Sequence, residues 1–187
     1  MGVKRVLAAA TVVVSIVTFV GCAARTDRPS DTIPHDAPSG GQTLAEMQDS
    51  LGSIPGITVT DASSAPPNIK GNTGYSIDLE VEPGYTVLDG PALVDFVVAS
   101  VWSVREGYMP NAQIDISVSM PPGGVFDVAA AAVESGWAKE ARLPAGERST
   151  VGVLLNPNKD QGARNLERLG SWPGDVPDAP GGITAQE

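Results

Sequence analysis

The chain is poor in cysteine and histidine, which enzymes often use as a nucleophile and as an acid–base catalyst. Its 187 residues include one cysteine, Cys22, and one histidine, His35, and both precede the region in which regular elements are predicted. A Ser-His or Cys-His relay in the folded part is therefore excluded by count. The spacings of a nucleophile elbow, a zinc-binding helix, a Cys-x-x-Cys pair and an EF-hand loop are also absent. No metal and no cofactor is expected.

Basic residues are scarce as well. The chain has 12 Lys and Arg against 22 Asp and Glu, so its formal net charge is −10, and no basic run interrupts the acidic composition. A surface of this charge repels nucleic acid and anionic headgroups. Nucleic-acid binding is therefore not expected, and the length favours one folded domain.

The stretch from Met1 to Cys22 has the pattern of a secretory signal. A positively charged start, an apolar run from Val6 to Val20 and a small residue lead directly to the cysteine. The last four residues resemble the lipobox of bacterial lipoproteins, with phenylalanine in place of the usual leucine: Phe19-Val20-Gly21-Cys22. The resemblance implies cleavage after residue 21 and lipidation of Cys22, and two acyl chains are enough for stable anchoring. We therefore expect a lipoprotein on the extracytoplasmic face of the cell membrane.

The same stretch is long enough for an uncleaved membrane helix. Val6 to Ala24 carries no charge, and a membrane span needs about 17 to 25 residues. Against this alternative, many Ala, Thr, Ser and Gly residues weaken its hydrophobicity, and Arg25 and Arg28 balance the positive charge before the run. We favour the lipoprotein and keep a single-helix anchor as the alternative. Both place the domain outside the cytoplasm.

Proline, glycine and polar residues dominate the two ends of the remaining chain. Residues 22–42 predict a disordered, lipid-anchored tether, and we assign no catalytic role to His35 within it. Residues 156–187 predict a C-terminal extension, with one short helix over Gln161 to Leu169 and a disordered tail over Pro173 to Glu187. The apolar face of that helix is expected to consist of Ala163, Leu166 and Leu169.

Residues 43–155 carry the signals of one α+β domain. Strand-like alternation or apolar runs occur at Ile57–Asp61, Tyr75–Glu82, Gln113–Met120 and Thr150–Leu155, with a short edge strand at Trp137–Leu143. Helix caps and helical spacing predict helices at Thr43–Gly52, Asp89–Glu106 and Phe126–Ser135. The order predicts a two-layer sandwich with a mostly antiparallel sheet and helices on one face. Phe96 and Trp102 are expected in its core.

The element order resembles that of ferredoxin-like and BON-type modules of bacterial envelopes. These modules also carry a helix-Pro-Gly-strand step like the one in Ile54-Pro55-Gly56-Ile57. The bias toward Ala, Gly, Val and Asp is similar to that of actinobacterial secreted proteins. We carry over no residue role from either resemblance.

Carboxylates are the catalytic groups that remain in the folded part. Two acids suffice for a glycosidase, and the candidates are Asp95, Asp115, Glu134 and Glu140. A further row of acids lies on one face of the second strand, where residues two apart are separated by about 7 Å, too far for a compact metal site. We expect this row to be a solvated face: Asp78, Glu80 and Glu82.

The sequence therefore favours a non-catalytic binding or accessory module of the cell envelope over its alternative, a carboxylate-based hydrolase of wall polysaccharide. Its partner is expected to be an envelope protein or a cell-wall component. Because loops on a rigid core commonly carry contacts, the expected contact surface consists of Ala62–Thr73, Pro121–Gly124 and Pro144–Ser149.

Overall fold

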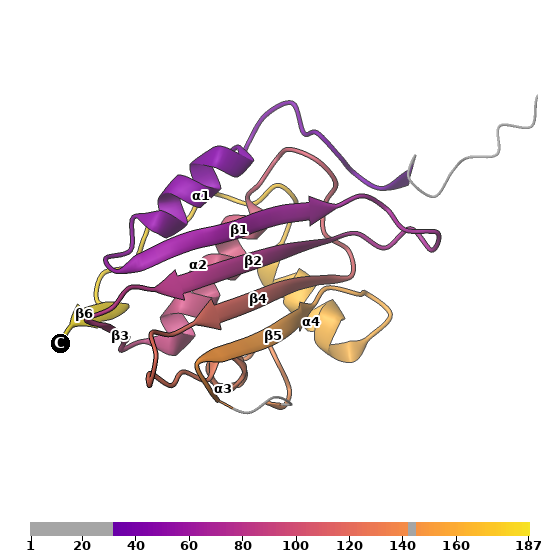
Figure 1. The fold of residues 1–187 in the computed structure, drawn as a ribbon. Helices are drawn as coiled ribbons and strands as arrows, with labels where there is room; N and C mark the ends of the chain where they lie inside the picture. Colours follow the sequence, from indigo (N-terminus) through magenta and orange to yellow (C-terminus); the bar gives the residue numbers. More distant parts are fainter. Residues whose placement is uncertain (1–31, 142–144) are drawn as a thin grey trace, which may run out of the picture.

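The structure is a computed structural model that describes residues 32–141 and 145–187 (Figure 1). The leader and Cys22 lie outside these residues. The described helices and strands follow the order α1 (Leu44–Gly52), β1 (Ile57–Ala65), β2 (Gly74–Val81), β3 (Tyr85–Val87), α2 (Gly90–Trp102), β4 (Gln113–Ser119), α3 (Val128–Glu134), β5 (Arg148–Leu154), α4 (Asp160–Leu169) and β6 (Thr184–Gln186).

A mixed, four-stranded sheet forms one layer, in the order β1-β2-β4-β5. The outer pairs β1–β2 and β4–β5 are antiparallel, and the central pair β2–β4 is parallel. A parallel pair needs a crossover connection, which α2 supplies here. The predicted α+β class, with a mostly antiparallel sheet covered on one face by helices, is confirmed. The sheet is built as β-β-α-β-α-β, whereas a ferredoxin-like unit runs β-α-β-β-α-β.

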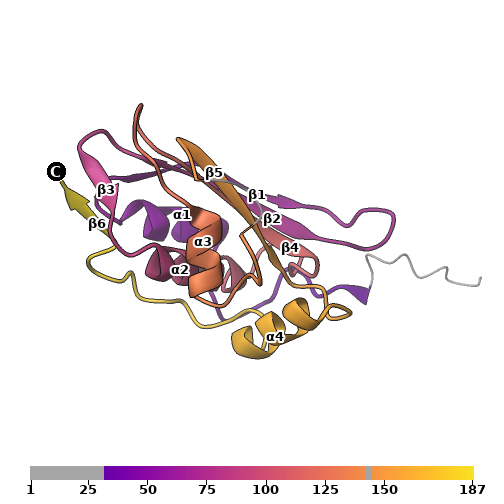
Figure 2. The same cartoon turned by 90° about the horizontal axis from the view of Figure 1, so that it is seen from below.

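The helices α1, α2 and α3 cover one face of this sheet, and α4 lies apart from them near the end of β5 (Figure 2). The central helix α2 is apolar nearly all round, which is typical of a buried helix. Phe96 and Trp102 are each 3% exposed, so their predicted burial is confirmed. The alternation in β2 also holds, because its core face buries Tyr75, Ile77, Leu79 and Val81.

The helix starts follow the predicted caps. The Thr43 hydroxyl accepts from the Glu46 N–H, and the Glu46 carboxylate accepts from the Thr43 N–H, which completes the capping box. Asp89 caps α2 in the same manner, by accepting from the Ala92 N–H. Each cap satisfies backbone donors that the helix itself leaves unpaired.

The N-terminal segment does not form a disordered tether up to Gln42. Ile33 and Gln42 are buried, and backbone hydrogen bonds join this segment to the strand-like stretch after α2, including Gln42 N–H to Ser103 C=O and Arg105 N–H to Gln42 C=O. His35 contacts Tyr108, with ring centroids 5.2 Å apart. This docking was not predicted, because the segment pairs through its backbone rather than through an apolar stripe.

The C-terminal tail is also packed rather than disordered. Ile183 is 1% exposed in the core, and its carbonyl accepts from the N–H groups of Leu88 and Asp89. The strand β6 then pairs with β3 in an antiparallel sheet that the sequence did not predict. One buried isoleucine and a short backbone ladder hold a segment that has no periodicity.

In the C-terminal half, one further prediction is wrong and another holds in part. The described part of Trp137–Leu143, residues 137–141, forms no strand, and the remainder lies outside the described residues. The helix predicted at Gln161–Leu169 is present as α4, and Leu166 and Leu169 pack partly buried against the core, but Ala163 is exposed. The fully buried positions of α4 are Gly162 and Asn165. A polar residue occupies the inner face of α4 because it serves there as a hydrogen-bond donor to two carbonyl groups.

Candidate functional site

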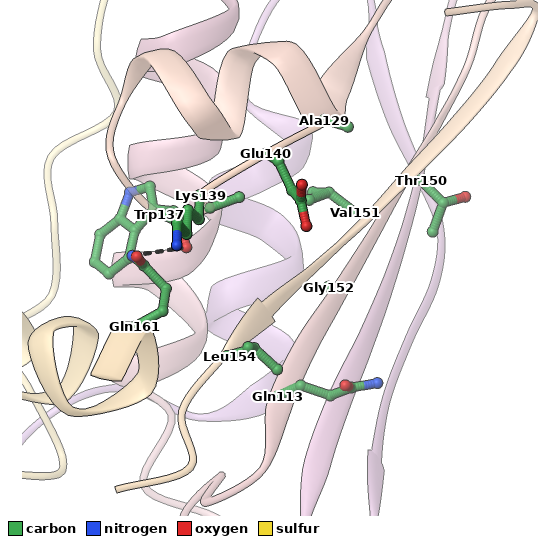
Figure 3. Close-up of a pocket in the computed structure, with 11 residues that line it drawn as sticks. Gln113, Ala129, Trp137, Lys139, Glu140, Thr150, Val151, Gly152, Leu154 and Gln161 are labelled. Atoms are coloured by element: carbon green, nitrogen blue, oxygen red, sulfur yellow. Dashed lines mark hydrogen bonds between the residues drawn. The ribbon is translucent and has the colours of Figure 1, made fainter. Parts of the chain in front are cut away.

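A cavity of about 500 Å³ lies beside β5, the last strand of the main sheet (Figure 3). Its walls come from β4, α3, the segment after α3, β5 and α4, and the lining is mostly apolar or neutral: Gln113, Ala129, Trp137, Ala138, Lys139, Glu140, Thr150, Val151, Gly152, Leu154 and Gln161. This volume falls within the range of ligand pockets. We call the cavity together with the outer edge of β5 the β5 groove.

The edge of β5 presents backbone groups to this groove. Two hydrogen bonds just beyond the ends of the β4–β5 ladder show which residues of the two strands bond to each other. The Leu155 N–H donates to Ala112 C=O, and the Met120 N–H donates to Glu147 C=O. In an antiparallel ladder such pairs alternate, so the odd-numbered residues of β5 bond to β4 and the even-numbered ones point outward. The N–H and C=O groups of Thr150 and Gly152 therefore face away from the sheet, toward the groove.

Helix α4 fixes one end of the groove. The Asn165 side-chain amide donates to Leu154 C=O over 2.9 Å and to Trp137 C=O over 3.1 Å. Gln161 donates to Gly136 C=O over 2.9 Å and lies at the Trp137 carbonyl (Figure 3). Because these bonds tie the helix to β5 and to the segment after α3 together, they hold the groove wall in place.

Trp137 is the largest side chain of this wall and is itself tightly held. It is 3% exposed, its Nε1 donates to Asp95 Oδ1 over 2.5 Å, and the Arg168 guanidinium lies 3.9 Å from its ring centroid. Arg168 also pairs with Asp95 over 2.8 Å. The groove therefore has a rigid aromatic wall, since such a stack is stabilised by both the cation–π contact and the ion pair.

A smaller hollow of about 250 Å³ lies behind that wall, and Trp102, Trp137, Asp95 and Asp175 line it. Asp95 is already engaged there by Trp137 and Arg168. The hollow therefore contains two carboxylates, one of which is part of a structural ion pair.

The four candidate acids lie on four different parts of the fold. Asp95 is on α2, Asp115 is on β4 and accepts from the Gln113 amide, Glu134 is exposed on α3, and Glu140 lines the β5 groove. Neither hollow is lined by two of them. Across the described ranges, no three His, Cys, Asp or Glu residues gather in a way that could hold a metal ion.

The acidic row, with Asp78 and Glu80 on β2 and Glu82 directly after it, lies on the open face of the sheet, as predicted. Asp78 pairs with Arg148 over 3.1 Å, Glu82 accepts from the Thr58 hydroxyl, and Glu80 is exposed. An exposed pair of this kind contributes about 0 to 1 kcal/mol. The row therefore acts as a polar surface that keeps this face of the sheet in water.

The structure brings together two of the three predicted contact loops. The Gly123 N–H donates to the Glu147 carboxylate over 2.8 Å, so Pro121–Gly124 lies beside residues 145–149, while Pro144 is outside the described residues. The hairpin between β1 and β2 lies at the opposite end of the sheet (Figure 1). It is shorter than predicted, because β1 continues to Ala65, and it exposes Ile69 almost completely, at 96%.

The β5 groove was not predicted from the sequence. The strand at Thr150–Leu155 was expected, but nothing in a single strand's alternation indicates that it lies at the edge of a sheet. Gly152 was the one available signal, because glycine within a strand often marks a close approach by another backbone or ligand.

Comparison with protein-family models, curated proteins and solved structures finds no match to this chain. The fold and the β5 groove define the protein as a two-layer α+β module with a groove at one edge strand of its sheet. Of the helices that the structure describes, none has the length and apolar character needed to cross a membrane.

Proposed function

We propose that this protein is an extracytoplasmic lipoprotein, anchored to the cell membrane through lipidated Cys22, whose folded domain is a non-catalytic binding module of the cell envelope. The observation that carries the binding function is the β5 groove, which combines a cavity of about 500 Å³ with outward-facing backbone donors and acceptors. Its partner is an envelope protein or a cell-wall component. An anchored module gains effective concentration near such a partner, so even weak binding is useful.

The chemistry of the groove favours binding over hydrolysis. Among the described residues, Glu140 is the one carboxylate in its lining, whereas a glycosidase needs two carboxyl groups about 5 to 10 Å apart. Of the lining residues that the structure describes, Lys139 is the one cation, and those other than Lys139 and Glu140 are neutral. Neutral walls with a few polar groups are typical of sites that hold a ligand without transforming it.

Anchoring is tested by replacing Cys22 with alanine or serine in the full-length chain. The unchanged protein should fractionate with membranes and show an acylated, shortened chain by intact mass, because lipid is attached to Cys22 before cleavage. Both variants should lose the acyl mass. An unmodified full-length mass for the unchanged protein contradicts the lipoprotein and favours the single-helix anchor.

In the alternative, a carboxylate-based hydrolase of wall polysaccharide, the catalytic acids would be Asp95 and Asp175, which line the smaller hollow. Purified protein incubated with cell-wall polysaccharide should release no new reducing ends. Release that disappears in both Asp95→Asn and Asp175→Asn variants, while Asp160→Asn remains active, would establish the hydrolase instead.

A further inference from the structure

We propose that the β5 groove binds an extended peptide segment of a partner protein, which adds to the main sheet as a new strand beside β5. This inference rests on the binding function proposed above and names the chemical class of its ligand. It is carried by the outward backbone groups of Thr150 and Gly152, to which no described residue is hydrogen-bonded, and by the cavity next to them.

The edge of β5 offers the hydrogen bonds that a strand requires. Thr150 and Gly152 both direct N–H and C=O groups outward, and the next outward carbonyl, that of Leu154, already accepts from Asn165. The spacing of two residues along a strand, about 7 Å, matches the spacing of donors and acceptors in a second strand. A peptide in another conformation cannot pair with several of these groups at once.

The side chains around the groove determine what such a strand contains. Thr150 and Gly152 face the open, polar side of the sheet: the Thr150 hydroxyl lies 3.2 Å from that of Ser117, and a Cβ on Gly152 would lie 3.2 Å from Asp115 Oδ1. Val151 faces the other side, toward the cavity walls. The ligand therefore alternates polar side chains with small apolar ones, and the apolar set enters the cavity beside Ala129 and Ala138.

The two edges of the sheet differ in their capacity to accept a strand. The register of β1 shifts between Val59 and Asp61, which marks a bulge that interrupts the ladder, and natural proteins use bulges and charges to protect edges. The register of β5 against β4 is continuous from Arg148 to Leu154. The β5 edge is therefore the regular one, and a cavity adjoins it.

Charge favours a partner over a second copy of this chain. Each copy carries a formal charge of −10, so pairing two β5 edges brings like charges together. The described lining of the groove contains Lys139 and Glu140, whose opposite charges nearly cancel. A neutral or basic extended segment is the occupant that this electrostatic setting attracts.

The direct test uses synthetic peptides with the sequence Thr-Val-Thr-Val-Thr-Val-Thr-Lys, acetylated and amidated. One version is N-methylated at its valines, a second at its last three threonines, and a third at both sets. N-methylation removes the donors along one edge of an extended peptide. In an antiparallel ladder the polar-side residues donate to β5, and in a parallel ladder the cavity-side residues do.

We expect one of the two singly methylated peptides to bind and the doubly methylated peptide not to bind. Binding should protect the amide protons of Thr150 and Gly152 from exchange with solvent. The valine-methylated peptide identifies antiparallel addition, and the threonine-methylated peptide identifies parallel addition. Equal binding of all three peptides, or no protection at peptide concentrations of about 1 mM, overturns the proposal.

Two variants of the domain locate the binding. Thr150→Pro removes an outward N–H without removing a bond to β4 and should weaken binding about tenfold. Its matched control, Thr150→Val, loses the hydroxyl contact but keeps the N–H, so it should weaken binding much less than Thr150→Pro does. Ala138→Phe fills the cavity without altering β5 and should also weaken binding. Unchanged affinity in Ala138→Phe, with the fold intact by circular dichroism, contradicts the proposed placement.

If a second copy of the chain occupied the β5 groove, hydrogen exchange would give a different result. The amides of Thr150 and Gly152 would then be protected in the free protein and would lose that protection on dilution, which overturns the peptide proposal. Failure of the peptide test leaves membrane anchoring through Cys22 unaffected, and failure of anchoring leaves peptide binding unaffected. The two proposals are thus separately falsifiable.

Discussion

Tyr75 lies at the start of β2 with its ring in the core and its hydroxyl bonded to the segment that follows α2. It is 3% exposed and donates to the Glu106 carbonyl over 3.0 Å. Burial raises the pKa of Tyr75 from 10.0 to about 12, because the phenolate would lose its hydration. The residue therefore links the stability of the sheet to pH in the alkaline range.

The sign of this dependence follows from the two pKa values. The unfolded chain releases the Tyr75 proton near pH 10, whereas the folded chain keeps it until about pH 12, so stability falls as pH rises between these limits. Denaturant titrations at several pH values in this range should show the decline. Tyr75→Phe should reduce its slope, and an unchanged slope in that variant contradicts the assignment.

Among the elements, α4 is held by a buried polar contact in addition to the partly buried Leu166 and Leu169. Asn165 is 2% exposed and donates to the carbonyl groups of Trp137 and Leu154. Asn165→Ala should lower the free energy of unfolding by about 1 to 3 kcal/mol, because it leaves buried acceptors unpaired. Hydrogen exchange of the α4 amides should become faster.

The control for this element is Glu167→Ala on the exposed side of the same helix. Its effect should lie within about 0.5 kcal/mol, as for most surface substitutions. If the two variants are equally stable, the Asn165 contacts do not hold α4. The same pair of variants also reports on the β5 groove, since α4 forms one end of it.

For the whole molecule, the two terminal segments pack against the central elements and contribute buried residues to the domain. Ile183 is 1% exposed, and Ile183→Ala should cost about 2 to 5 kcal/mol, as for other buried large-to-small substitutions. Val176→Ala, at a half-exposed position in the same tail, is the matched control and should change stability little. Equal denaturant midpoints for the two variants would show that the tail is not part of the folded unit.

Periodicity and capping are local signals, and they determined most of the secondary structure from the sequence. The alternation in β2 and β4, the capping box at Thr43 and the cap at Asp89 were each sufficient, because every such signal lies within a few residues. The α+β class followed from the order of these elements. The burial of Phe96 and Trp102 followed from the apolar character of their helix.

Contacts between distant residues were decided by the tertiary structure alone. The docking of residues 32–42, the β3–β6 pairing and the inward position of Asn165 depend on backbone groups that meet partners far along the chain. Such groups are the same in every residue, so the sequence does not mark them. The β5 groove arises for the same reason: which strand ends the sheet is a property of strand order, and only the assembled sheet shows that Thr150 and Gly152 lie at its edge.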